Sequence, residues 1–441
     1  MQNQELIRDY LLSNLVNPDK RRIGVEIECL IHTKDGNRLP VNPSRTFSSV
    51  DLMDELESRQ RRDNPKSWYS LEPGGQLEWA SPPESNLFEI RRCFDRHLAR
   101  MTEIRNRYGF LVLDYSLEPV HHPQEIELIR QRKYELMHAR FLTTGSRGPW
   151  MMRNSTSVQI NIDYCSIEEA GEMAFLADAL TPIAAGLFAH SPFAGSRPAS
   201  KENLRAIIWS RTDPARCGSL WNQGIRSPQN FVDHYAQWAA TVPLMFIPDE
   251  NGGWQSSSLT GGEWLQSRTG TENSAQDTLI LLHQIFTHVR FKNVLELRGV
   301  DRPPFGYELA PPAWWLGLLT REDLRRELVD RVLRWTDDER QALEQTAFQV
   351  DWTQPAPENR SLESWIRELS QLAMQGLISR RNATGVDETV YLQPFLEQVL
   401  ARGPFAIQRQ TDFLATGESL PAYIQQQFKD RVLLHESEIG T

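Results

Sequence analysis

Alternating polar and apolar residues over 22–30 predict a β-strand with one acidic face. Glu26 and Glu28 project together from one side of such a strand, opposite the apolar Val25 and Ile27. Glutamate is disfavoured in strands and neighbouring like charges repel, so this face costs stability unless a cation lies over it. Taken alone, the segment also fits an antiparallel strand with one solvated face.

The same alternation recurs in three later segments, residues 75–79, 157–163 and 294–298. Solvated strand faces are usually rich in threonine, serine, lysine and arginine, whereas these faces carry mainly carboxylates and carboxamides, the oxygen ligands that hard divalent cations prefer. We therefore predict one shared acidic sheet face that binds Mg2+. Its polar positions in these segments are Gln76, Glu78, Gln159, Asn161, Asp163, Glu296 and Arg298.

A tight turn is predicted at Pro73-Gly74-Gly75, between two short strands. A hairpin at this turn would bring Glu72, which precedes it, and Glu78, which follows it, to one end of the same face. The turn therefore adds a further carboxylate to the predicted metal site.

Helical spacing of apolar positions and cap residues outline the other elements. Helices are predicted over 4–16, 48–61, 86–108 (ending at Gly109), 123–139, 229–240 and 275–287, and from a capping box of Ser166 and Glu169 to about residue 190. Further strands are predicted over 111–114, 151–164 and 291–298, and a loop or short strand over 203–213. Together these elements predict an α+β fold.

The part of the chain that begins at Trp314 shows almost no strand pattern. Thr320, Thr336 and Ser361 resemble helix caps, and the pair Trp314-Trp315 is interpreted as core. We expect residues 1–312 to form a catalytic sheet-and-helix region and residues 313–441 a helical layer packed on it, within one continuous domain.

Composition and charge reduce the number of protein classes to which this chain could belong. The 441 residues are 40% hydrophobic with a net charge of -10, which is typical of a globular protein and argues against nucleic acid or a membrane as a partner. Four cysteines without metal-ligand spacing predict neither a disulfide framework nor a cysteine metal site. An amino terminus without signal-peptide features and the absence of a spanning segment predict a cytoplasmic location.

Two arginines and a tryptophan are candidates for binding anions. There is no phosphate-binding glycine loop of the common kinds, so ATP, if used, must be held mainly through Mg2+ on carboxylates. Arg298 lies two residues from Glu296 and suits the charge that develops on a transferring phosphoryl group, although a salt bridge to a neighbouring glutamate is the simpler alternative. Arg205 could bind an amino-acid carboxylate in a pocket walled by Trp209, or the two could be a surface ion pair and a core aromatic.

Taken together and in this order, six segments resemble the plant and proteobacterial type of glutamate-cysteine ligase. The resemblance implies a glutamine-synthetase-like fold, in which an antiparallel sheet curves into an open cup with helices on its outer face. It also implies that the side-chain carboxylate of glutamate takes the γ-phosphate of ATP and that the amine of cysteine attacks the acyl phosphate. The segments lie at 24–28, 71–78, 151–163, 191–193, 204–213 and 295–301.

The resemblance also implies roles for individual residues. Arg298 would face the transferring phosphoryl group, Arg205 and Trp209 the amino-acid substrate, and Asn161 the nucleotide or a metal. The chain departs from the family pattern at 133–137, 210–211 and 303–305, mainly on the side of the amine acceptor. The implied metal ligands are Glu26, Glu28, Glu72, Glu78, Gln159 and Glu296.

The sequence therefore predicts a ligase that uses ATP with Mg2+ or Mn2+ to join glutamate to cysteine, the first step of glutathione or related thiol biosynthesis. We expect a monomer or homodimer with these small molecules as its partners. Three alternatives are left open by the residues: the same chemistry with another amine or carboxylate, a glycoside hydrolase that uses two strand carboxylates, and a non-catalytic module with a metal-stabilised acidic face.

Overall fold

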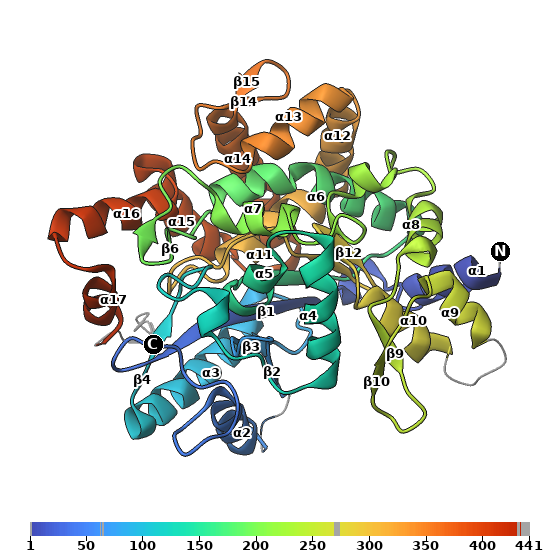
Figure 1. Ribbon diagram of the computed structural model, residues 1–441. Helices are drawn as coiled ribbons and strands as arrows, with labels where there is room; N and C mark the ends of the chain where they lie inside the picture. Colours follow the sequence, from blue (N-terminus) through green and yellow to red (C-terminus); the bar gives the residue numbers. More distant parts are fainter. Residues whose placement is uncertain (1, 62, 64–65, 269–273, 430–432, 434–441) are drawn as a thin grey trace.

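The computed structural model describes residues 2–61, 63, 66–268, 274–429 and 433, and an antiparallel sheet lies at its centre (Figure 1). Among these residues seven strands join in the order β12-β13-β5-β1-β3-β2, with β4 paired to β1. Every pairing in this sheet is antiparallel. The strands are β1 (Ile23–Thr33), β2 (Trp68–Leu71), β3 (Leu77–Ala80), β4 (Phe110–Leu113), β5 (Val158–Ile162), β12 (Val289–Phe291) and β13 (Leu295–Leu297).

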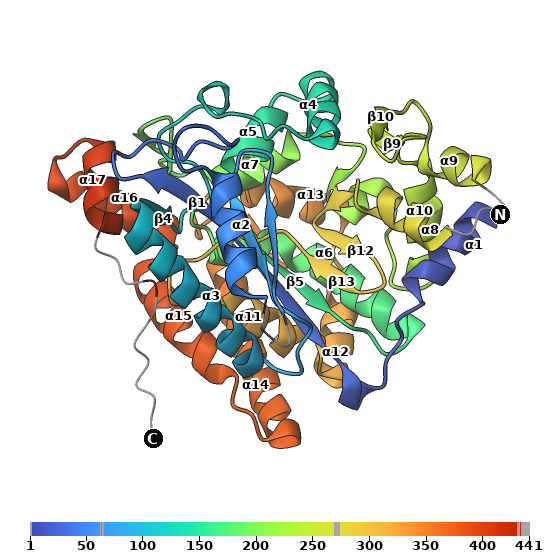
Figure 2. The same cartoon turned by 90° about the horizontal axis from the view of Figure 1, so that it is seen from below.

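Helices cover both faces of the sheet (Figure 2). Those on or near the apolar face are α3 (Leu87–Tyr108), α6 (Ile167–Leu187), α11 (Ala310–Leu319), α12 (Glu322–Val332), α13 (Asp337–Thr346), α14 (Leu362–Thr384) and α15 (Thr389–Arg402). On the polar side lie α4 (Arg132–Thr144), α5 (Gly148–Asn154) and α7 (Leu204–Ser210). The others are α1 (Gln2–Leu11), α2 (Ser49–Arg59), α8 (Phe231–Thr241), α9 (Gly261–Ser267), α10 (Ser274–Leu282), α16 (Phe405–Thr416) and α17 (Leu420–Lys429).

Short two-stranded pairs complete the fold: β6 (Phe193–Ala194) with β7 (Arg197–Pro198), β8 (Cys217–Gly218) with β11 (Phe286–Thr287), β9 (Phe246–Pro248) with β10 (Trp254–Ser256), and β14 (Pro355–Ala356) with β15 (Arg360–Ser361). The prediction of an α+β fold with an antiparallel sheet is confirmed in this form.

The alternation read from the sequence decides which face of the sheet is apolar. Val25 and Ile27 of β1, and Ile160 of β5, are almost fully buried. One hydrophobic cluster joins these strand residues to core residues of both 1–312 and 313–441. Trp314 and Trp315 belong to this cluster, which confirms their interpretation as core.

Helices α11 and α14 cross at very short range because both carry glycine at the crossing. A Cβ atom on Gly317 would lie 2.1 Å from the carbonyl oxygen of Ala373, and one on Gly376 would lie 1.8 Å from that of Gly317. Glycine at these positions therefore lets the C-terminal helices lie backbone to backbone with the helix that covers β5.

Several predicted helix ends are confirmed by the contacts that cap them. Helix α3 begins after Asn86, whose side chain accepts a hydrogen bond from the backbone N–H of Glu89, and it ends at Gly109 with φ 73°. Thr336 and Ser361 cap α13 and α14. Thr320 does not begin a helix, because it terminates α11 and α12 starts after Arg321.

Other predictions are wrong in detail. The strand predicted over 151–164 begins only at Val158, because Gly148-Pro149 starts helix α5, which runs to Asn154. Residues 203–213 hold helix α7 instead of a loop or short strand, since Leu204 and Ile208 are one helical turn apart and pack into the same apolar cluster. Ser166 caps α6, but the Glu169 carboxylate binds the Cys165 N–H and Arg21, so no reciprocal capping box forms.

No helix of the described residues is long and apolar enough to span a membrane.

Candidate active site

The strand register brings the predicted polar residues onto one face of the sheet. Glu28 lies directly opposite Glu78 across β1 and β3, and Glu26 lies opposite Gln159 across β1 and β5. Asn161 of β5 is opposite Glu296 of β13 in the same way. Because directly paired residues of an antiparallel sheet project to the same side, four distant segments contribute to one polar surface.

Three carboxylates of this surface form a compact cluster. Glu28, Glu72 and Glu78 can each offer an oxygen such that all three atoms lie within 4.8 Å of one another. Glu72 joins the cluster through the hairpin turn, in which Gly75 has φ 77° and donates its N–H to the Glu72 carbonyl oxygen at 2.8 Å. The predicted hairpin at Pro73-Gly74-Gly75 is therefore confirmed.

The cluster is electrostatically unfavourable without a cation. Burial raises the pKa of Glu28 to about 7, and the charge of Glu72 adds to the rise. Burial also raises the pKa of Glu72, and it raises the pKa of Glu78 well above the ordinary value with help from Glu26, Glu72 and Glu28. Carboxylates that resist ionisation together are suited to a divalent cation, whose charge would favour the ionised forms.

Hydrogen bonds fix the orientation of the carboxylates. Glu28 accepts from the backbone N–H of Ser157 at 2.9 Å and from the Gln159 amide at 2.8 Å. Glu26 accepts from the Asn161 amide at 2.8 Å. The carboxamides of β5 thus hold the acidic residues of β1 in place.

Glu296 lies at the centre of a cationic group beside the acidic cluster. Its fully buried carboxylate pairs with Arg290 at 2.8 Å and Lys292 at 2.5 Å, and also with Arg298. Although burial alone would raise the pKa of Glu296, these three cations hold it well below its ordinary range. Arg298 also donates to the Gln159 side-chain oxygen, so it is held from two strands at once.

A basin of about 340 Å³ lies over the acidic cluster. Its floor contains the sheet carboxylates, Gln159 and Arg298, and its other walls come from α4, α5, α7 and the β9–β10 pair, on the polar side of the sheet in Figure 2. Besides the floor, it is lined by Ser70, Lys133, Tyr134, Met137, Met151, Ser157, Trp209, Phe246, Trp254, Ile280, His283, Phe286 and Arg290.

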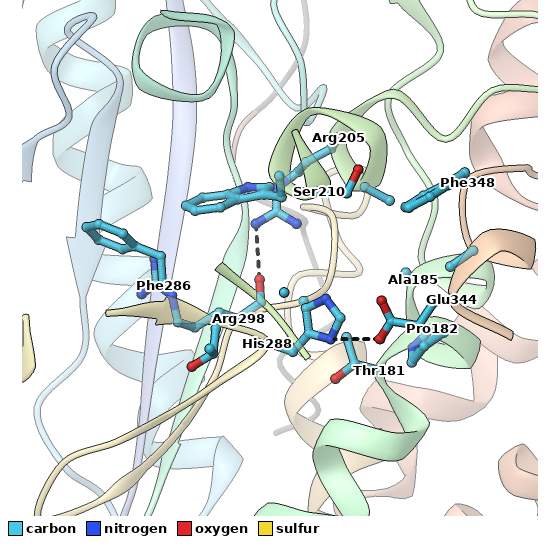
Figure 3. A pocket seen from close by; sticks show the side chains of 16 residues that line it. Thr181, Pro182, Ala185, Arg205, Ser210, Phe286, His288, Arg298, Glu344 and Phe348 are labelled. Atoms are coloured by element: carbon cyan, nitrogen blue, oxygen red, sulfur yellow. Dashed lines mark hydrogen bonds and ion pairs between the residues drawn. The ribbon is translucent and has the colours of Figure 1, made fainter. Parts of the chain in front are cut away.

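A second, smaller pocket of about 60 Å³ adjoins the basin (Figure 3). Trp209, Phe286 and Arg298 line both spaces and form the wall between them. Arg205 lines only the smaller pocket, where it is buried and donates to the Arg298 carbonyl oxygen at 3.1 Å. Arg205 and Trp209 are four residues apart on α7, so they face the same side of that helix.

The structure thus brings most of the predicted site residues together. Glu26, Glu28, Glu72, Glu78, Gln159, Arg298 and Trp209 line the basin, and Arg205 lines the adjoining pocket. Asn161 and Glu296 do not line the basin but contact residues that do. Asp163 is not part of the site, since its carboxylate binds Asn14 and the backbone of Arg22.

Other residues of the two spaces were missed by sequence reasoning. Arg290 of β12 lines the basin, but the predicted strand began at residue 291, too late to include it. Glu344 of α13 occupies a core-facing helical position with Leu343 and Ala347, and a charged residue at such a position was a readable signal.

Comparison with known proteins gives a consistent result. The model of glutamate-cysteine ligase family 2 (GCS2) matches residues 22–426. A chloroplastic glutamate-cysteine ligase from Medicago truncatula is 29% identical over 413 residues, which cover 90% of this chain and 79% of the relative. Chloroplastic glutamate-cysteine ligase A from Oryza sativa subsp. indica is 27% identical over 427 residues, covering 92% and 84%.

Among solved structures, the fold resembles a glutamate-cysteine ligase from Francisella tularensis crystallised in complex with AMP. The TM-score is 0.55 at 14% sequence identity, and the match covers 94% of this chain and 90% of the other. At this identity the likeness concerns the fold.

Proposed function

The chain belongs to glutamate-cysteine ligase family 2, and from this premise we propose that it joins the γ-carboxylate of glutamate to the amine of cysteine while ATP is converted to ADP and phosphate. The observation that carries the proposal is the cluster of Glu28, Glu72 and Glu78 beside Arg298, on the floor of a basin. This arrangement combines a binding site for divalent cations with a fixed positive charge, which phosphoryl transfer from ATP requires.

We propose that Glu28, Glu72 and Glu78 hold Mg2+, or Mn2+ in its place, with Glu26 and Gln159 on the same floor as further ligands. Their oxygen donors fit a hard cation. Such an ion would neutralise the charge of the ATP phosphates, which this chain would otherwise have to bind beside a group of carboxylates. Glu296 and Asn161 support this set from β13 and β5, through Arg298 and Glu26.

Arg298 is assigned to the transferring phosphoryl group. Its guanidinium is fixed by Glu296 and Gln159 before substrate binds, so little reorganisation accompanies the reaction. Glu296 raises the pKa of Arg298 against the effect of burial, which keeps the group charged. Lys133 of α4 reaches the same basin and adds positive charge near the carboxylates.

Glutamate is assigned to the smaller pocket, with its α-carboxylate on Arg205 and Trp209 as the wall. Its side-chain carboxylate would then extend past Arg298 towards the basin and receive the γ-phosphoryl group. The amine of cysteine, entering from the basin, would displace phosphate from the acyl phosphate and form the amide. Tyr134, Met137, Met151 and Phe246 give the basin an apolar roof on which the adenine ring or the thiol can pack.

The same proposal covers the shape of the sheet and the domain organisation. The sheet would form an open cup of the glutamine-synthetase-like kind around the basin, and residues 1–441 would form one domain. The monomeric or homodimeric state and the cytoplasmic location stay predictions.

The proposal is tested by measuring ADP release with ATP, Mg2+, glutamate and a panel of amines that includes cysteine, 2-aminobutyrate, alanine and glycine. We expect turnover that requires both glutamate and an amine, with cysteine preferred and γ-glutamylcysteine identified by mass spectrometry. Turnover with another amine but not with cysteine would show that cysteine is not the amine acceptor. Absence of glutamate-dependent turnover with every amine would refute the ligase itself.

A further inference from the structure

The smaller pocket carries a negative charge that the proposed reaction does not yet use. Glu344 and His288 line it together with Arg205 and Arg298 (Figure 3). The Glu344 carboxylate comes from α13 in the helical layer, and His288 comes from the link between β11 and β12. Arg205 reaches the same space from α7.

Arg205 has donor capacity left for a ligand. Its side chain is only 5% exposed, and its Nε has no hydrogen-bond partner among the described residues. Its nearest carboxylate, that of Asp301, is 3.9 Å from Nη1, which is too far for a hydrogen bond. A buried guanidinium with an unused N–H in the wall of a pocket is suited to a carboxylate of the bound molecule.

Within the described parts of the chain, Glu344 lacks a close cationic partner in this pocket. Its side chain is 21% exposed, and among the described residues His288 is the basic group within salt-bridge distance, with Nδ1 3.9 Å from the carboxylate. Ser219 hydrogen-bonds to the same carboxylate, and the charge of Arg340 acts on it from farther away. No arginine or lysine of the described parts forms a salt bridge with it, and burial raises the pKa of its carboxyl group. A ligand cation placed here would favour the ionised form of Glu344.

We infer that Glu344 binds the α-ammonium group of the glutamate substrate while Arg205 binds its α-carboxylate. This inference rests on the proposed function and adds a specificity-determining residue to it. A pocket of about 60 Å³ has room for only a few water-sized groups, which suits the small zwitterionic end of one amino acid better than a nucleotide. Opposite charges in one pocket then select an α-amino acid over a dicarboxylate that lacks the amine.

The test compares L-glutamate with glutarate, which has both carboxylates but no ammonium group. In steady-state assays with ATP, Mg2+ and cysteine, Glu344→Gln should raise the KM for glutamate at least about 10-fold. The Ki of glutarate as an inhibitor competitive with glutamate should stay within about twofold. Asp338→Asn is the matched control, because it removes an exposed carboxylate from the same helix.

A second measurement does not depend on turnover. Glutamate alone should raise the melting temperature of the wild-type protein and of Asp338→Asn, and should raise that of Glu344→Gln much less. A parallel change in the constants for glutamate and glutarate, or no change in either, would overturn the inference. A wild-type protein without glutamate-dependent turnover would instead overturn the proposed function on which the inference depends.

Discussion

Replacing Glu78 by glutamine should stabilise the metal-free protein while it damages the active site. Glu78 lies directly opposite Glu28 in the β1–β3 ladder, and like charges in that position repel. Glutamine has nearly the same shape, and the Ser70 hydroxyl, which donates to Glu78 at 2.6 Å, can rotate to serve an amide instead. The substitution therefore removes a charge with little loss of packing.

The pKa of Glu28 shows what burying a carboxyl group in this cluster costs. The pKa of Glu28 is raised by burial from 4.5 to about 7. Such a change costs the folded state about 3 kcal/mol at a pH above 7, because one pKa unit corresponds to about 1.4 kcal/mol. Burial and the charges of Glu26, Glu72 and Glu28 raise the pKa of Glu78 well above its ordinary value, so Glu78→Gln should make the metal-free protein more stable.

The sign of the pH dependence follows from the raised pKa. Well below its ordinary pKa of 4.5 the carboxyl group of Glu78 is protonated in both the folded and the unfolded chain, so it does not affect the pH dependence of stability there. As the pH rises, the unfolded chain releases a proton that the folded protein retains, and the free energy of unfolding of the metal-free wild type falls. The stability of Glu78→Gln should fall less steeply, so the two curves separate between pH 5 and pH 8.

The assay is thermal and chemical unfolding of both proteins at pH 5 and pH 8, each with EDTA or with Mg2+. At pH 8 with EDTA the variant should melt a few degrees higher than the wild type. Mg2+ in about 100-fold excess over its Kd should add about 2.7 kcal/mol to the wild type, and much less to the variant, which lacks one ligand. Glu57→Gln, at an exposed position on α2, is the control.

A variant that is less stable than the wild type at pH 8 without metal would refute this reasoning. Equal stabilisation of both proteins by Mg2+ would show that Glu78 is not a ligand.

Three further predictions concern the arginines and the helical layer. Arg298→Ala should lower kcat/KM for ADP formation at least about 100-fold. The Tm should change little, because Glu296 keeps its ion pairs with two other cations. An unchanged rate would contradict the role given to Arg298. Arg205→Ala should raise the KM for glutamate more than about 10-fold and leave the KM for ATP within about twofold, and equal changes in both would argue against a glutamate pocket. Gly317→Ala should destabilise the protein by about 2 kcal/mol or more, measured by urea unfolding, because the added Cβ atom would lie 2.1 Å from the Ala373 carbonyl oxygen. A variant as stable as the wild type would contradict the close helix crossing.

Short-range patterns were sufficient to predict the strands of the acidic face and several helix ends. Side chains alternate along any strand, so the acidic pair on β1 and the carboxamides on β5 were readable without a structure. The ends of helix α3 were predictable for a similar reason, because Asn86 and Gly109 cap the backbone directly beside them. Helix α7 was not, since a seven-residue helix has few periodic positions and its packing partners lie elsewhere in the chain.

What the sequence by itself determined is the chemical character of the site: which residues are acidic, that they alternate with apolar ones, and that Arg298 accompanies them. The tertiary structure decided their grouping. Strand register placed Glu28 against Glu78, and the hairpin added Glu72. Pairing and packing between distant segments depend on the burial of the whole apolar face, which no local pattern contains. For the same reason only the fold could place Glu344, which comes from the C-terminal helices, in the pocket of Arg205.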